Sequence, residues 1–193
     1  QADRLLAQAK SDGLDELMVI STCNRTELMG IADDPKVLID YLCAFSGGDA
    51  SFFMEKGYVL SGRNALNHVF RVGCGLESQI VGDFEIIGQL KKSFFNSKKY
   101  NMVNGFSERL VNAVIQSSKR IKTETDLSSG ATSVSFASVH YILENVKEVP
   151  QKNILLFGTG KIGRNTCENL IKHTQSDQIV LVNRSEESAQ RVA

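Results

Sequence analysis

The stretch NILLFGTGKIG, at residues 153–163, places a glycine-rich turn directly after an apolar strand and at the start of a helix. The turn has the pattern GxGxxG, in which the first glycine permits a tight turn, the second lets a pyrophosphate approach the backbone, and the third allows close packing of strand and helix. Amides at a helix N-terminus also favour an anion. The stretch therefore predicts a dinucleotide site, and the alternative is a tight turn without a ligand. The predicted cofactor-binding residues are Gly158, Thr159, Gly160, Lys161, Ile162 and Gly163.

The helix after the turn is predicted to end near His173, and a second apolar strand follows at residues 179–182. NAD-selective proteins usually place an acidic residue after this strand, where it accepts hydrogen bonds from the ribose. This chain has Asn183, Arg184 and Ser185 there. An arginine can pair with a 2′-phosphate, and a serine can donate a hydrogen bond to it. We therefore predict NADPH as the cofactor, whereas a solvated arginine would leave the site unable to distinguish the two nucleotides.

The composition excludes several classes of protein. The chain has 193 residues, 42% of them hydrophobic, and 22 Lys and Arg balance 22 Asp and Glu, so collagen-like, disordered and disulfide-scaffold classes are excluded. No apolar run approaches the roughly 18–20 residues of a membrane span, and the N-terminus lacks the pattern of a signal peptide. We expect a soluble cytoplasmic protein with no membrane partner. The four cysteines include no CxxC pair, so we predict no metal site and no disulfide.

The balanced charge hides a basic tract. Residues 84–125 contain eight basic and three acidic residues, so the rest of the chain is correspondingly acidic. Such a tract can attract a polyanion, but lysine-rich helix faces are often only solvated. Both interpretations stay open on composition alone.

The first 130 residues predict an α+β domain that ends at a linker. The apolar run 17–20 predicts a buried strand, and Asp33 or Asp34 is expected to cap a helix that starts at Pro35 and ends near residue 45. The linker candidate is the Ser- and Gly-rich segment 127–133. The other expected elements are a strand near 58–60, helices at about 1–10, 65–72, 86–99 and 106–124, and a helix of about 13 residues that ends near 146.

The polar residues that follow the first strand suggest a nucleophile. Cys23 lies beside Thr22, Asn24 and Arg25. A free thiol with a pKa of about 8.5 is only a few per cent thiolate at neutral pH, and a nearby guanidinium favours the charged form. From these residues alone, Cys23 is either a nucleophile or a small buried residue, as we expect for the other three cysteines.

The chain closely resembles glutamyl-tRNA reductase in several motifs that occur in the order of that family. The glycine turn and the strand end at 183–185 also fit the family pattern. The resemblance spans most of the chain and favours Cys23 as the nucleophile. The matching motifs are STCNRTE (21–27), HVFRV (68–72), GLES (75–78), GQLK (88–91) and TSVS (132–135).

The resemblance implies NADPH-dependent reduction of glutamyl-tRNA to glutamate-1-semialdehyde, the first step of tetrapyrrole and haem synthesis from glutamate. The ester that joins glutamate to tRNA is already activated, unlike a free carboxylate. Attack by the Cys23 thiolate would form a thioester and release tRNA, and hydride transfer would then give the aldehyde. The residues and the resemblance thus point to the same chemistry.

The resemblance also implies roles for individual residues. His68 matches a histidine important for activity in the family, and an imidazole can accept or return a proton, or only position other groups. Arg25 can bind a substrate carboxylate through two parallel hydrogen bonds. Where many members have Gly-Glu-Pro-Gln, this chain has Gly-Asp-Phe-Glu at 82–85, which changes shape and charge. The implied substrate-binding residues are Thr22, Asn24, Arg25, Ser78, Asp83, Phe84, Glu85 and Gln89.

The predicted fold is α/β. It comprises a catalytic domain at 1–130, a linking helix at 131–150 and the first part of a Rossmann-type NADPH-binding domain at 151–193. We expect the chain to be a fragment, because one β-α-β unit is too short to close a dinucleotide domain. The resemblance implies a homodimer formed through a further helical region, and an aminotransferase that receives the aldehyde. The alternative functions are a noncatalytic tRNA-binding or regulatory module, and an NADP dehydrogenase that acts on a free small molecule.

Overall fold

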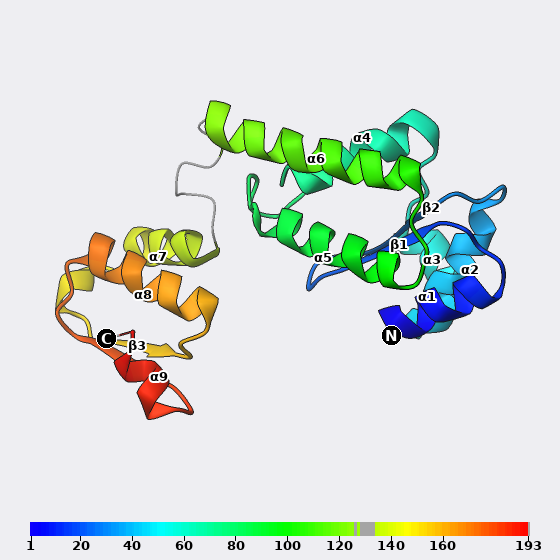
Figure 1. Cartoon of the computed structure of the whole chain (residues 1–193). Helices are drawn as coiled ribbons and strands as arrows, with labels where there is room; N and C mark the ends of the chain where they lie inside the picture. Colours follow the sequence, from blue (N-terminus) through cyan, green and yellow to red (C-terminus); the bar gives the residue numbers. More distant parts are fainter. Residues whose placement is uncertain (126, 128–133, 193) are drawn as a thin grey trace. The chain divides into compact units, whose positions relative to one another are not determined.

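The computed structural model describes residues 1–125, 127 and 134–192 (Figure 1). The chain divides into two units, unit 1 at Gln1–Asp126 and unit 2 at Leu127–Ala193. Apart from Leu127, the predicted linker lies outside the described residues. Each unit is described by itself.

A β-hairpin lies at the centre of unit 1. Its strands β1 (Leu17–Ser21) and β2 (Thr26–Gly30) are antiparallel, with Leu17 opposite Gly30 and Ser21 opposite Thr26. Successive side chains of a strand point to opposite faces. Met18 and Ile20 therefore enter one hydrophobic cluster, and Leu17 and Val19 enter another. Because β1 is buried on both faces, it appears in the sequence as an uninterrupted apolar run.

Six helices are described in unit 1, and all of them except Ala50–Lys56 contribute side chains to the two clusters. Val69 of α4 packs with residues of α5 and α6 around Met18 and Ile20, whereas Leu5 and Leu6 of α1 pack with Leu17 and Val19. The helices are α1 (Ala2–Ser11), α2 (Pro35–Ser46), α3 (Ala50–Lys56), α4 (Gly62–Gly73), α5 (Glu85–Lys99) and α6 (Gly105–Glu124).

Most of the elements predicted for unit 1 are confirmed. The Asp34 side chain accepts a hydrogen bond of 2.8 Å from the amide of Lys36 and caps α2, and Pro35 occupies the first turn as expected. The strand predicted near 58–60 is wrong. Tyr58, Val59 and Leu60 are 59, 48 and 40% exposed and belong to no strand, because no neighbouring strand pairs with them or covers them. The sequence prediction also lacked β2 and α3.

Unit 2 contains the predicted β-α-β arrangement. Strands β3 (Ile154–Phe157) and β4 (Ile179–Val182) are parallel, and α8 (Lys161–Thr174) connects them. Helix α7 (Val134–Asn145) packs against α8, and its Ser135 hydroxyl donates a hydrogen bond of 3.1 Å to the carbonyl of Ile162 (Figure 1). The other elements are a 3-10 turn, η2 (Val149–Gln151), and the short helix α9 (Glu186–Gln190).

The mixed helix-and-strand fold confirms the predicted α/β class. Among the helices that the structure describes, no single one combines the length and apolar character needed to cross a membrane. One pair, Pro35–Ser46 and Ala50–Lys56, meets the length and composition criteria together, but it is bent by 110°.

Candidate active site

The turn between β1 and β2 carries Cys23 and is ordered by Thr22. The Thr22 hydroxyl accepts hydrogen bonds from the amides of Asn24 (3.2 Å) and Arg25 (3.1 Å). The Thr22 amide donates to the Arg25 carbonyl at 2.8 Å and closes the turn. A threonine can fix a turn in this way because its hydroxyl bonds to nearby backbone groups. Thr22, predicted to orient the substrate, therefore determines the conformation of the loop that presents Cys23.

The four cysteines differ in accessibility. Cys23 is exposed, Cys43 is half-buried, and Cys74 and Cys167 are buried. Burial raises the pKa of the Cys74 and Cys167 thiols, because a thiolate is poorly solvated in an apolar interior. Of the four thiols, Cys23 is the one that combines exposure with a neighbouring arginine in a fixed turn.

The Arg25 side chain connects the hairpin to the segment between α4 and α5. It is 13% exposed, and its Nη1 donates to Glu27 Oε1 at 3.1 Å. Its Nη2 donates to the backbone carbonyl of Glu77. A guanidinium has five N–H donors, so these two hydrogen bonds leave three N–H groups for a ligand. Arg25, predicted to bind a substrate carboxylate, is already oriented by protein groups.

Glu27, His68 and Tyr58 form a polar cluster next to Arg25. His68 Nε2 lies 3.1 Å from Glu27 Oε2 and 3.3 Å from the Tyr58 hydroxyl, which is itself 3.3 Å from Glu27 Oε1. The side chains of Glu27 and His68 are both 17% exposed, and the Tyr58 ring meets the imidazole edge-on at a centroid distance of 5.6 Å. Burial, followed by the Glu27 charge, raises the pKa of Tyr58, so its hydroxyl stays protonated.

The cluster determines the tautomer of His68. A carboxylate only accepts hydrogen bonds, so the proton between His68 and Glu27 resides on Nε2. Nδ1 of a neutral imidazole is then the acceptor nitrogen, and it has no hydrogen-bond partner among the described residues. Glu27 and Tyr58 were not predicted as site residues. Glu27 belongs to the STCNRTE motif, but its contact with His68 spans 41 positions of sequence.

Two glycines close the loop that carries Ser78. Gly75 has a φ of +74°, and a Cβ there would lie 2.8 Å from the Asp83 carbonyl oxygen. The amides of Gly82 (2.9 Å) and Ser78 (3.4 Å) both donate to the Gly75 carbonyl. Ser78 is half-buried and directly follows Glu77, which the Arg25 side chain contacts. The structure thus brings Ser78 to the side of the site where Arg25 lies.

The remaining predicted substrate-binding residues lie at the start of α5. Asp83 Oδ1 accepts a hydrogen bond of 2.9 Å from the amide of Glu85. Phe84 lines a separate hollow between α5 and α6, and Gln89 is exposed on α5. Among the described residues, neither Phe84 nor Gln89 is hydrogen-bonded to the Cys23 turn.

The glycine turn of unit 2 uses each glycine differently. Gly158 has a φ of +92°, and its amide donates to the Val182 carbonyl at 2.7 Å. A Cβ at Gly163 would lie 2.0 Å from the Gly158 carbonyl oxygen, whereas a Cβ at Gly160 would meet no atom within 4 Å. Gly160 is also the N-cap of α8. The backbone at Gly160 is therefore unobstructed at the N-terminus of α8, where a phosphate group can approach the amides. The glycine turn thus fits a dinucleotide.

Side chains from the end of β4 support this turn. Thr159 is 3% exposed, its amide donates to Asn183 Oδ1 at 3.4 Å, and its hydroxyl lies 3.0 Å from that of Ser188. The Ser185 hydroxyl accepts from the Ser188 amide at 3.4 Å and caps α9. Arg184 is exposed and has no carboxylate partner within the described part of the chain. Arg184 therefore carries an unpaired positive charge, which can pair with a 2′-phosphate. The described residues contain no group of three or more metal-ligating side chains.

Fold and site together define a mixed α/β protein in which a unit with an exposed cysteine turn precedes a β-α-β unit with a glycine-rich turn. Residues 1–125 match the family described as glutamyl-tRNAGlu reductase, N-terminal domain. The chain therefore belongs to the glutamyl-tRNA reductase family, which confirms the resemblance found in the sequence.

Individual relatives agree with this assignment. Glutamyl-tRNA reductase of Christiangramia forsetii is 60% identical over 190 residues, which are 98% of this chain and 46% of the relative. The enzyme of that name from Flavobacterium psychrophilum is 58% identical over 189 residues, again 98% of this chain and 46% of the relative. The solved structure of glutamyl-tRNA reductase from Methanopyrus kandleri matches with a TM-score of 0.64 and 27% identity, covering 100% of this chain and 46% of that one. The chain spans about half the length of the curated relatives it matches.

Proposed function

We propose that the protein carrying this chain reduces glutamyl-tRNA to glutamate-1-semialdehyde with NADPH, through a thioester on Cys23, as the first step of tetrapyrrole synthesis. One observation carries the proposal. In a chain of this family, the exposed Cys23 lies on a turn fixed by Thr22, and its neighbour Arg25 joins the Glu27–His68 cluster. We assign residues 1–130 to the catalytic domain, 131–150 to a linking helix and 151–193 to part of the NADPH-binding domain.

The chain's residues form and release the thioester. Cys23 Sγ attacks the carbonyl carbon of the ester, the C–S bond forms as the C–O bond to tRNA breaks, and the tRNA hydroxyl receives a proton. His68 accepts the thiol proton at Nδ1 and returns a proton to the leaving oxygen, while Glu27 keeps the other imidazole proton on Nε2. Bound at the glycine turn, NADPH would supply a hydride to the thioester carbon. The C–S bond then breaks, which releases the aldehyde and returns Cys23 as the thiolate.

The remaining site residues bind the glutamyl group and the cofactor. The unused N–H groups of Arg25 bind the substrate carboxylate, and Asn24 and Ser78 supply polar contacts. Asp83, Glu85 and Gln89 complete the substrate site from the start of α5. For the cofactor, the open backbone at Gly160 binds the pyrophosphate and Arg184 pairs with the 2′-phosphate.

The proposed partners beyond tRNA follow from the family. The intact protein forms a homodimer through a region outside this chain, and an aminotransferase receives the reactive aldehyde. Both proposals depend on the family assignment.

Mass spectrometry of the intact protein tests the proposal. After incubation with glutamyl-tRNA without NADPH, we expect a glutamyl adduct on the peptide that contains Cys23. Cys23→Ser should show no adduct and should lose aldehyde formation by roughly 10³-fold or more. Cys43→Ser is the matched control, because it removes a half-buried thiol outside the site and should keep both signals. Undiminished reduction by Cys23→Ser would overturn the thioester mechanism.

A further inference from the structure

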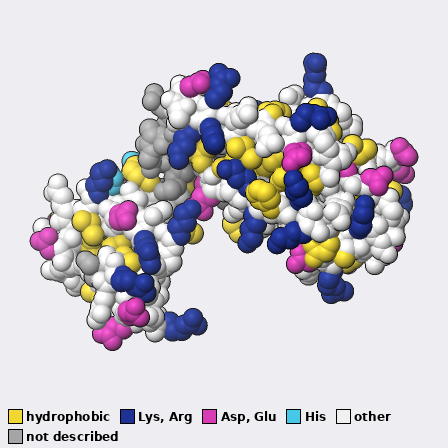
Figure 2. Space-filling view, viewed as in Figure 1, with side chains coloured by type: hydrophobic (Ala, Val, Ile, Leu, Met, Phe, Trp, Pro, Cys, Tyr) yellow, Lys and Arg dark blue, Asp and Glu magenta, His cyan; other side chains and the backbone are white. Residues whose placement is uncertain are grey.

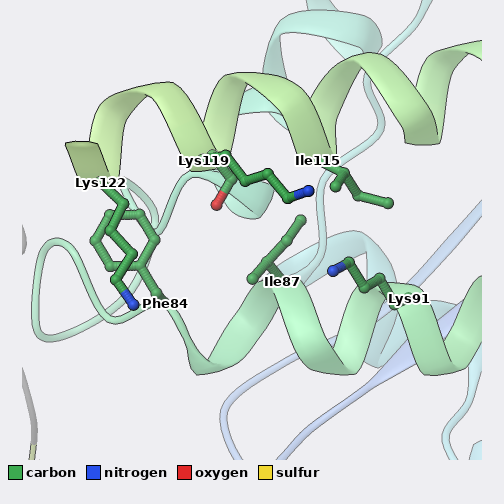
Figure 3. A pocket seen from close by; sticks show the side chains of 7 residues that line it. Phe84, Ile87, Lys91, Ile115, Lys119 and Lys122 are labelled. Atoms are coloured by element: carbon green, nitrogen blue, oxygen red, sulfur yellow. The ribbon is translucent and has the colours of Figure 1, made fainter. Parts of the chain in front are cut away.

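A small hollow on unit 1 lies between α5 and α6, away from the Cys23 turn. It has a volume of about 120 Å³, and three lysines and Phe84 line it over Ile87 and Ile115. Figure 3 shows the amino groups of Lys91 and Lys119 directed toward one another across the gap between the helices, with Lys122 beside the Phe84 ring. In the view of Figure 2, basic side chains surround exposed hydrophobic atoms over this part of α5 and α6.

Two lysines of the hollow, Lys91 and Lys119, differ from Lys98 and Arg120 of the same two helices. Lys98 pairs with Glu108 at 2.9 Å, and Arg120 pairs with Glu124 at 3.0 Å. Lys91 and Lys119 pair with no carboxylate among the described residues. Two ammonium groups that face one hollow repel each other unless an anion lies between them. Lys92 and Lys99 also pair with no carboxylate among the described residues, but they do not line the hollow. The convergence of Lys91 and Lys119 on one hollow is therefore the feature that favours an anionic ligand.

The size and lining of the hollow narrow the chemistry of this anion. A hollow of about 120 Å³ is large enough to hold a phosphate group. The phenyl ring of Phe84 at its edge provides a face on which a base can stack, as aromatic residues do in proteins that bind single strands. A phosphate next to an unpaired base is a feature of single-stranded nucleic acid.

The hollow is close to the substrate site along the chain. Phe84 lies between Asp83 and Glu85, which we assign to the substrate site. Glu77, whose carbonyl accepts from Arg25, is only seven positions before Phe84, so at most about 25 Å of chain separates the two. The next step rests on the proposed function. In glutamyl-tRNA, the ester joins glutamate to the 3′-terminal nucleotide of the tRNA. The nucleotides next to that ester must lie near the glutamyl site.

We infer that the Phe84–Lys91–Lys119 hollow binds the unpaired 3′ end of the tRNA substrate, with a backbone phosphate between the two ammonium groups and a base on the phenyl ring. This assigns a role to Phe84, at which the chain departs from the proline of many family members. It also gives the basic tract at 84–125 a specific contact rather than only a general attraction for polyanions.

A binding experiment with the intact protein tests the inference. The two ligands are deacylated tRNA and the same tRNA without its unpaired 3′-terminal nucleotides. For the unmodified protein, trimming should weaken binding about 10-fold, since base stacking and phosphate contacts are lost. For the double variant Lys91→Ala, Lys119→Ala, intact tRNA should bind about 10-fold more weakly, and trimming should change its affinity less than 2-fold.

The control removes the same charge from a surface outside the hollow. Lys92 and Lys99 of α5 are exposed and do not line it, so Lys92→Ala, Lys99→Ala should retain the full penalty of trimming. The inference is overturned if the unmodified protein shows no penalty, or if the Lys91, Lys119 variant keeps it. Absence of an adduct on Cys23 would refute the proposed reduction instead, and the trimming result would still decide whether the hollow binds the RNA end.

Discussion

The Cys23 turn and the glycine turn both begin where an apolar strand ends, but they are stabilised in opposite ways. In the first, the Thr22 hydroxyl accepts two amide hydrogen bonds and Arg25 bonds to Glu27 and Glu77. In the second, the left-handed backbone of Gly158 and its hydrogen bond to Val182 determine the course of the chain. Side chains organise the first turn, whereas glycines set the backbone path of the second, to which the Asn183 side chain adds one hydrogen bond.

The difference follows from what each turn is proposed to bind. A nucleophile needs an oriented thiol with charged groups around it, and these groups are side chains. A pyrophosphate needs backbone amides that it can approach closely, and a Cβ in front of them would block it. Substitutions in and around the two turns test this contrast.

Among substitutions of the groups that shape the two turns, the largest effect is expected at the glycine turn. In Gly163→Ala the new Cβ would lie 2.0 Å from the Gly158 carbonyl oxygen, which is backbone and cannot rotate away. We expect the free energy of unfolding of unit 2 to fall by about 1–3 kcal/mol or more. We also expect NADPH binding to be lost. Thermal unfolding and equilibrium titration with NADPH on the intact protein measure the two effects.

Gly160→Ala is the matched comparison, because its Cβ would enter open space. Its stability should stay within about 1 kcal/mol of the original, the scale of an N-cap change. Its dissociation constant for NADPH should nevertheless rise about 10-fold, since the methyl group takes the position of the phosphate. Unchanged NADPH affinity in Gly160→Ala would show that the cofactor does not approach this part of the turn.

A smaller effect is expected at the polar cluster beside Cys23. Glu27→Gln removes the carboxylate that fixes the proton on His68 Nε2, so we expect kcat to fall about 10- to 100-fold while KM for glutamyl-tRNA stays within 2-fold. Nitrogen NMR of His68 should change from one tautomer to a mixture. The pKa of Tyr58 should also decrease, because Glu27 contributes to raising it, and ultraviolet titration of tyrosine detects this shift.

Tyr58→Phe keeps the carboxylate and is the control for Glu27→Gln. Because the His68–Glu27 hydrogen bond remains, its kcat should fall less, by no more than about 5-fold. A rise in KM at constant kcat in Glu27→Gln would assign Glu27 to the orientation of Arg25 instead of His68.

Much of the fold follows from local sequence signals. The run at 17–20 predicts β1 because both of its faces are buried, and Asp34 with Pro35 predicts the start of α2. The glycine turn predicts the parallel pair around α8. The strand β2 lacks such a signal, because Thr26–Gly30 is at most half-buried and contains Glu27, a site residue, in place of an apolar one. Segment 58–60 is apolar, yet it meets no partner strand.

The candidate site depends more than the fold does on contacts between residues far apart in the sequence. Cys23, Thr22, Asn24 and Arg25 are adjacent in sequence, so their chemistry was visible as a group. Glu27 meets Tyr58 and His68 only because the chain returns after 31 and 41 positions, and such contacts have no periodicity or spacing that marks them. The hollow at Phe84 likewise requires that α5 and α6 pack side by side.

The smallest effect is expected for the exposed ion pair between Arg71 and Glu77, next to the contact between Arg25 and Glu77. The Arg71 Nε–H donates to Glu77 Oε1 and lowers the pKa of that carboxyl below its ordinary value of 4.5, while the Glu77 carbonyl accepts from Arg25. A lowered pKa in the folded state stabilises the protein above the unfolded value, and the stabilisation is lost as pH falls through the folded value. Arg71→Gln should therefore reduce stability at pH 7 by less than about 1 kcal/mol, since the pair is exposed. In urea titrations, the difference from the original protein should disappear as pH is lowered below 4.5, and the glycine turn should bind NADPH as before. A difference that persists undiminished at low pH would show that Arg71 acts through packing and not through its charge.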